Sequence, residues 1–209
     1  MNIKASLSTL ALSVAVLAPA SAMAEVSANI GWNSEYIFRG IFQKNSSAFA
    51  GVDYSSDNGF YIGTWGADVG DGLETDLYFG WGGGDDFTYS FGYTGYFYTD
   101  NFDDTYQEAN IGIGYGIFAL DLAIGQWDGF GNKQDYTFTS VTISPEKGPY
   151  FKIGSFSQDF DGDYFEMGYT YTMEDPGVDL SVAAIRGKDP IAEDWNLTFS
   201  ITKNIAIGN

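Results

Sequence analysis

The chain has 209 residues, a formal net charge of −19, no histidine and no cysteine. Such an acidic chain is poorly suited to bind the phosphate backbone of nucleic acids, so we expect no nucleic-acid partner. Without histidine or cysteine it cannot build a His/Cys zinc site, a nucleophile activated by a histidine base, or an internal disulfide. Paired carboxylates can catalyse in principle, but acids are too common here for a pair to be informative. We therefore expect neither an enzyme nor a bound cofactor.

The first residues have the pattern of a secretory signal. Lys4 supplies a positive charge, an apolar run extends from Leu7 to Leu17, and Ala22-Met23-Ala24 is a small-x-small cleavage site. The apolar run is shorter than the roughly 20 residues of a membrane-spanning helix. We expect cleavage after Ala24, which makes residues 1–24 a signal peptide and leaves residues 25–209 as one domain.

After residue 24, apolar and polar residues alternate with the period of two that is typical of β-strands. The stretch from Leu73 to Thr99 predicts two strands joined by a turn at Gly82–Asp86. Phe79 and Phe91 fall on an apolar, aromatic face, and Asp76 falls on the opposite face with other acids, hydroxyls and glycines. Such a sheet has hydrocarbon on one side and water on the other.

In chain order, the same alternation predicts twelve strands. They are expected at residues 26–38, 48–54, 59–67, 73–81, 87–98, 106–116, 118–127, 136–144, 149–157, 163–173, 178–185 and 195–202. A polar loop around Gln43–Ser47 is expected between the first two strands, and Tyr36 and Phe38 fall on the apolar face of the first. The faces of the strands at 136–144 and 149–157 stay open, because both carry aromatic residues.

The expected connections differ between the two ends of the sheet. Those after even-numbered strands are brief, whereas those after odd-numbered strands, such as Asp68–Gly72 and Gly187–Asp194, are mostly longer and acidic. This pattern is typical of an outer-membrane barrel whose N- and C-termini are periplasmic. We therefore predict an all-β, antiparallel, up-and-down transmembrane β-barrel of about twelve strands, in contact with outer-membrane lipid and lipopolysaccharide. A soluble periplasmic β-sandwich is the alternative fold.

Ionisable residues are destabilising against lipid, so we expect those on the polar strand faces to line a lumen. The candidates are Glu35, Arg39, Asp53, Glu74, Asp76, Glu108, Asp121, Lys152, Glu166 and Asp179. Eight of these ten are acidic, and carboxylates around a water-filled pore favour small cations. Alternatively, the polar side chains fill the interior, with Arg39 and Lys152 neutralising their neighbours. The barrel would then be plugged and would have a structural or surface-binding role.

The acidic segment Gln158–Asp163 contains carboxylates suited to a hard cation such as calcium. It does not place the loop glycine and the closing glutamate as an EF-hand loop does. Exposed acidic loops more often stay solvated or bind divalent ions weakly. The sequence therefore assigns no metal site.

Several stretches resemble a known family. NIGWNSEYIFRG at Asn29–Gly40, GFYIGTWGADV at Gly59–Val69 and ETDLYFGWGG at Glu74–Gly83 resemble the TorF-type porin family of proteobacteria, also known as the Gcw_chp conserved hypothetical proteins. TYQEANIGIGYG, which contains Glu108, is similar to a further stretch of that family. The resemblance implies an exported outer-membrane barrel of porin type with a largely unassigned substrate, and it supplies no catalytic residues. The expected function is a channel for small solutes that prefers cations.

Overall fold

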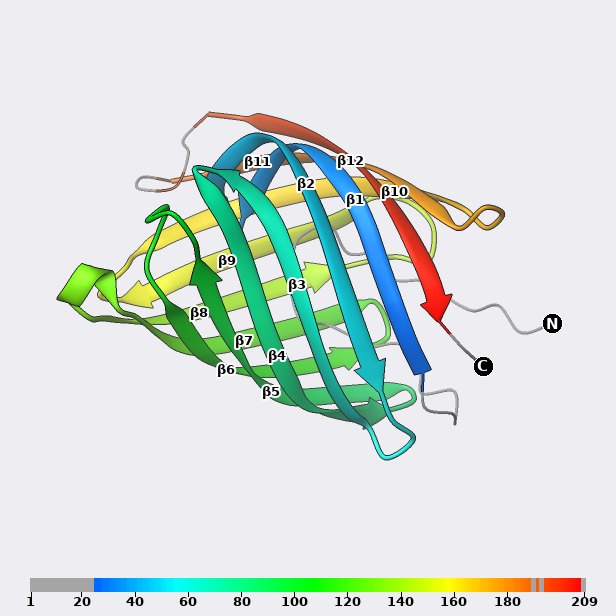
Figure 1. Cartoon of the computed structure of the whole chain (residues 1–209). Coiled ribbons are helices and arrows are strands. Elements are labelled where there is room, and N and C mark those ends of the chain that lie inside the picture. Colours follow the sequence, from blue (N-terminus) through cyan, green and yellow to red (C-terminus); the bar gives the residue numbers. More distant parts are fainter. Residues whose placement is uncertain (1–24, 189–190, 192–193, 208–209) are drawn as a thin grey trace.

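The protein is described by a computed structural model that covers residues 25–188, 191 and 194–207. In this part of the chain, twelve antiparallel strands form one closed barrel, in which β1 pairs with β12 (Figure 1). We call the end of the barrel where β1 begins and β12 ends the terminal end, and the opposite end the far end. The predicted signal peptide, residues 1–24, lies outside the described residues.

Each strand lies beside its neighbours in sequence, as the prediction of an up-and-down barrel requires. The strands are β1 (Glu25–Phe38), β2 (Ile41–Ser55), β3 (Phe60–Gly70), β4 (Gly72–Gly84), β5 (Phe87–Tyr98), β6 (Tyr106–Tyr115), β7 (Phe118–Trp127), β8 (Gln134–Ile143), β9 (Tyr150–Gln158), β10 (Gly162–Met173), β11 (Val178–Gly187) and β12 (Asn196–Ile207). A short 3-10 turn, η1 (Gly129–Gly131), follows β7. None of the helical segments in the described residues is long and apolar enough to cross a membrane.

The first hairpin differs from the prediction. Gln43–Ser47, expected as a loop, lies inside β2, and the chain turns at Arg39–Gly40 instead. Both turn residues have positive φ, 50° for Arg39 and 82° for Gly40. Positive φ at both central residues is the conformation of a two-residue hairpin turn that matches the twist of its strands. Polar residues at 43–47 thus continue a strand where the sequence pattern alone predicted an interruption.

The lengths of the connections do not separate the two ends as predicted. Asp71 alone joins β3 to β4, where a loop over Asp68–Gly72 was expected. The connection of β8 to β9 at residues 144–149, on the terminal end, is as long as that of β7 to β8 at residues 128–133, on the far end. Connection length therefore does not orient this barrel.

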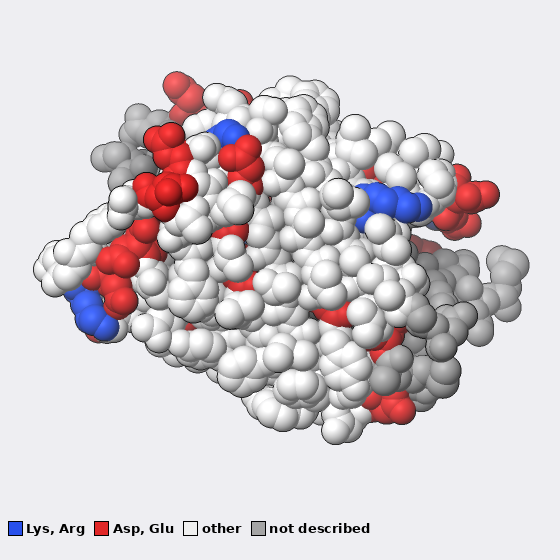
Figure 2. Space-filling view, in the orientation of Figure 1, with Lys and Arg blue, Asp and Glu red and all other residues white. Residues whose placement is uncertain are grey.

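The outer face of the barrel is apolar. The outward side chains of β4 and β5 stay exposed, as the alternation in this hairpin predicts, with 53% exposure at Leu77, 44% at Phe79 and 52% at Phe91. Figure 2 shows a mostly uncharged surface, with a few small acidic patches, between two ends where acidic and basic side chains gather. An apolar surface of this extent on a closed barrel suits contact with lipid.

Inside the wall, tyrosine rings pack against glycines directly opposite them on neighbouring strands. A Cβ added at Gly154 would lie 2.2 Å from the ring of Tyr164, and one added at Gly125 would lie 2.4 Å from the ring of Tyr136. Because a Cβ would not fit, glycine allows each ring to lie close to the backbone of the wall. The inner surface thus carries large rings that rest on the sheet.

The outer face makes a first testable prediction. Leu77→Arg places a cation in the middle of a lipid-facing strand and should lower the free energy of unfolding in lipid vesicles by about 2–4 kcal/mol. Leu73→Arg is the matched control, because Leu73 is equally exposed, at 54%, but lies next to the end of β4. The control should cost only about 0–1 kcal/mol. Equal losses in the two variants, measured by urea unfolding, would contradict lipid contact at Leu77.

Candidate functional site

The ten predicted lumen residues all lie on the inner side of the barrel wall or at the hairpin turn inside it. Seven are buried and three, Glu35, Asp53 and Asp121, are half-buried. Their sequence neighbours on the wall strands point outward, as in the alternation of Leu77 with Asp76. The site is therefore the barrel interior, and its geometry depends on what else enters that space.

The end of the β1–β2 hairpin, residues 36–41, leaves the wall and enters the interior, and we call this segment the hairpin end. A shift of register separates Tyr36 from Ile37, and both side chains are buried, with exposures of 3% and 6%. Successive side chains of a strand point to opposite faces, so both faces of the hairpin lie inside the barrel here. Figure 1 shows β1 and β2 bending over at the far end. The predicted outward direction of Tyr36 and Phe38 is wrong because this bulge turns the strand inward.

The two faces of the hairpin end pack against opposite sides of the barrel. On one face, the ring of Tyr36 lies 5.7 Å from that of Trp65 in β3, and Phe38 lies 5.6 Å from Tyr96 in β5, measured between ring centroids. On the other face, Ile37 joins a buried apolar cluster built from β7 to β11 and from Ile191. The hairpin end therefore divides the interior near the far end into two packed halves.

The turn of this hairpin is held by an ion pair. The Arg39 guanidinium donates two hydrogen bonds to the carboxylate of Glu108 in β6, from Nη1 at 2.8 Å and from Nη2 at 2.7 Å. Glu108 also accepts hydrogen bonds from Tyr96 at 2.7 Å, Tyr136 at 2.9 Å and Asn110 at 2.7 Å. Two-point charged hydrogen bonds of this kind fix orientation as well as adding stability. The Arg39–Glu108 pair thus joins the turn to the opposite wall.

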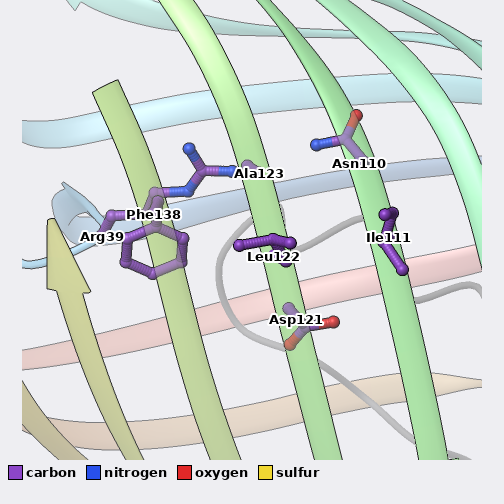
Figure 3. Close-up of a pocket in the computed structure, with 7 residues that line it drawn as sticks. All are labelled: Arg39, Asn110, Ile111, Asp121, Leu122, Ala123 and Phe138. Atoms are coloured by element: carbon purple, nitrogen blue, oxygen red, sulfur yellow. The ribbon is translucent and has the colours of Figure 1, made fainter. Parts of the chain in front are cut away.

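A small cavity lies beside the Arg39–Glu108 pair (Figure 3). Arg39, Asn110, Asp121, Ala123 and Phe138 are among the residues that line it. The Arg39 guanidinium carbon lies 4.4 Å from the centre of the Phe138 ring, a distance at which the ring face attracts a cation. Arg39 therefore has an aromatic partner as well as an acidic one, and little of it is available to a solute.

Other interior acids have neutral hydrogen-bond donors. Asp53 accepts a hydrogen bond from Tyr78 at 2.5 Å, Asp121 from Ser140 at 3.2 Å, and Asp179 from Asn204 at 2.8 Å. All three acids lie toward the terminal end, where β2 ends and where β7 and β11 begin. Their donors carry no charge. Lys152 interacts electrostatically with Asp121 as well as with Glu166, so acids are in excess over cations in this half of the interior.

Glu166 and Lys152 differ from those three acids. They lie directly opposite each other on β10 and β9. Glu166 also accepts a hydrogen bond from the Tyr150 hydroxyl at 2.5 Å. This arrangement, like that of Arg39 with Glu108, fits the alternative in which each interior cation neutralises an acid nearby.

Sequence reasoning missed the interior aromatic residues. Tyr136, Phe138 and Tyr164 are buried and face the hairpin end, and Tyr136 donates to Glu108. In β8, Tyr136 and Phe138 share one face while Val141 and Ile143 lie on the other, so both faces carry large apolar side chains and the inward face stayed undecided. A usable signal was present, because Ser140, the partner of Asp121, shares the face of Tyr136 and Phe138 at a spacing of two.

A closed up-and-down barrel with an apolar outside and an ionisable interior defines a porin-like barrel. The chain belongs to the Gcw_chp family, described as bacterial proteins of unknown function, which it matches over residues 17–150. No curated protein matches the sequence.

Solved structures share the fold at very low sequence identity. The KdgM porin is 7% identical, with a TM-score of 0.60 over 87% of this chain and 99% of that one. The KdgM porin in complex with disordered oligogalacturonate is 6% identical, with a TM-score of 0.54 over 88% of this chain and 99% of that one. These similarities establish the fold as that of a porin.

The Arg39–Glu108 pair makes a second prediction. Glu108→Gln leaves the buried Arg39 cation without a charged partner and should destabilise the barrel by about 3–5 kcal/mol. Arg39→Met should cost less, because Glu108 keeps its donors Tyr96, Tyr136 and Asn110. The double variant should be more stable than the sum of the two losses predicts.

Urea unfolding of the four proteins measures this coupling. Lys44→Met is the control, because the ion pair of Lys44 with Asp68 is partly exposed and should contribute at most about 1 kcal/mol. Additive losses in the Arg39 and Glu108 variants would show that the two side chains do not act as a pair.

Proposed function

We propose that this protein is an outer-membrane porin of the TorF type that passes small solutes and prefers cations. The observation that carries the proposal is the closed barrel with an apolar belt outside and acids in excess inside. Closure leaves no strand edge unpaired in lipid. Residues 1–24 would direct export and be removed, and the barrel would insert from the periplasm.

Charge supports the preference for cations. Among the ten interior residues, Arg39 and Lys152 each have an acid beside them, Glu108 and Glu166. The six remaining acids have no further basic residue within this set of ten, and those that interact with Lys152 or Arg39 share it with Glu166 or Glu108. Carboxylates lining a water-filled path attract cations and repel anions. In this proposal the interior carboxylates select charge and take no part in catalysis.

The same charge argues against acidic solutes. One of the similar structures is the KdgM porin in complex with disordered oligogalacturonate. Galacturonate units carry carboxylates, which six interior acids of this chain would repel. We therefore do not propose that solute for this protein.

Conductance and selectivity test the proposal. In planar bilayers, the refolded barrel should give stepwise conductance. In a KCl gradient, the reversal potential should have the sign expected for a channel that passes K⁺ more readily than Cl⁻. Asp53→Asn, Asp121→Asn and Asp179→Asn together should move this potential toward zero, because they neutralise three acids of the terminal half.

The matched control removes the same number of charges outside the lumen. Asp57, Asp85 and Asp86 are exposed on turns at the terminal end, and their replacement by Asn should change the reversal potential much less. An unchanged potential in the lumen variant would refute the role of these acids. The absence of conductance from a folded wild-type barrel would remove the open channel.

A second function, a plugged barrel with a structural or surface-binding role, is favoured by the hairpin end inside the lumen. Arg39→Ala with Glu108→Ala removes the ion pair that crosses the interior and should increase single-channel conductance relative to wild type. If the wild-type barrel is silent and this variant conducts, the plugged barrel is the better description. Equal, open conductance in both proteins would mean that the hairpin end does not limit the path.

A further inference from the structure

Glu74 and Asp76 form an acidic group of their own at the level of the hairpin end. They are two residues apart on β4, so both point inward, and their exposures are 1% and 0%. The Tyr36 hydroxyl, on the hairpin, donates a hydrogen bond to Glu74 Oε1 at 2.9 Å. Both acids therefore lie inside the barrel, next to the hairpin.

Three of their four carboxylate oxygens have no hydrogen-bond partner among the described residues, namely Glu74 Oε2 and both oxygens of Asp76. Leaving buried charged oxygens without a partner is costly. Arg39 acts on Asp76 electrostatically, but both of its terminal nitrogens already donate to Glu108. The two acids thus lie side by side without a cation of their own.

We propose that Glu74 and Asp76 bind a small monovalent metal cation, such as K⁺ or Na⁺. Carboxylate oxygens are the ligands that hard cations prefer. Trp65 and Tyr96, both buried, flank Asp76 in the strand ladder, and aromatic faces attract cations. The inference rests on the proposed channel function, since an ion crossing the interior would meet this pair beside the hairpin.

The surroundings favour a bare monovalent ion over other cations. Asp76 has no exposed surface, whereas the pockets that bury drug-sized organic ligands span about 300–1,000 Å³. Calcium takes about 6–8 oxygen ligands, and nowhere in the described residues do three acids gather to hold a metal. Two carboxylates hold a monovalent ion loosely enough for it to leave again, as conduction requires.

Thermal unfolding of the purified protein in detergent tests this site without requiring conduction. The midpoint is compared in potassium chloride and in N-methylglucamine chloride at equal ionic strength, because N-methylglucamine is too large to enter. Potassium should raise the midpoint by about 2–4 °C in a saturable way. Glu74→Gln with Asp76→Asn should abolish this response. Asp85→Asn with Asp86→Asn removes two exposed charges from a turn outside the lumen and should keep it.

The outcomes separate the site from the channel. Equal wild-type midpoints in the two salts, a full potassium response in the double variant, or a response to calcium alone would each overturn the site. If the double variant does not fold, Asp76→Asn alone takes its place, since Glu74 then keeps its bond with Tyr36. A potassium response in a protein that does not conduct in bilayers would support the site and count against the channel only.

Discussion

The pairing of β1 with β12 is the constraint on which the rest of the structure depends. It joins Val26 to Ile207 and continues to Asn33 opposite Ser200, so that the sheet has no free edge. In lipid, a free edge would leave a row of backbone groups without hydrogen bonds. Closure in turn obliges every strand to present one face to hydrocarbon and the other to a shared interior. The apolar belt and the buried acids are two results of this one requirement.

The hairpin end does not place one face against hydrocarbon and the other against the interior, because beyond Tyr36 it no longer belongs to the wall. It has an interior on both sides, and its packing resembles that of a small protein core more than that of a barrel strand. The Arg39–Glu108 pair is the polar part of this core. Its carboxylate accepts hydrogen bonds from residues on β5, β6 and β8, and so a single acid ties the turn to several parts of the wall. The interior is consequently unequal: the hairpin end packs its far half, where Glu74, Asp76 and Glu108 are buried, and does not reach Asp53, Asp121 and Asp179 toward the terminal end.

Most of the wall could be predicted from the sequence, because lipid on one side and water on the other impose a period of two that local residues record. For Leu77 and Asp76, the alternation within their own strand was enough to predict which side chain points outward and which points inward. The hairpin end could not be predicted in this way. The pairing of β1 with β2 changes register between Tyr36 and Ile37, opposite Gln43. The contacts that hold the hairpin end inside come from Trp65, Tyr96 and Phe138, which are distant in sequence. Likewise, Gln43–Ser47 is polar enough for a loop, and only its pairing with β1 makes it a strand.

The opposed glycines and tyrosines of the inner wall also determine how wide the interior can be. The pairs are Gly63 with Tyr78, Gly125 with Tyr136, Gly154 with Tyr164, and Gly168 with Tyr150. Each glycine acts as a recess that receives a ring, so the ring takes up little of the cross-section. A single methyl group at one of these glycines would lift its ring toward the barrel axis. The inner width of this barrel therefore depends on glycines of the wall. Substituting one of them would change that width without altering any charge.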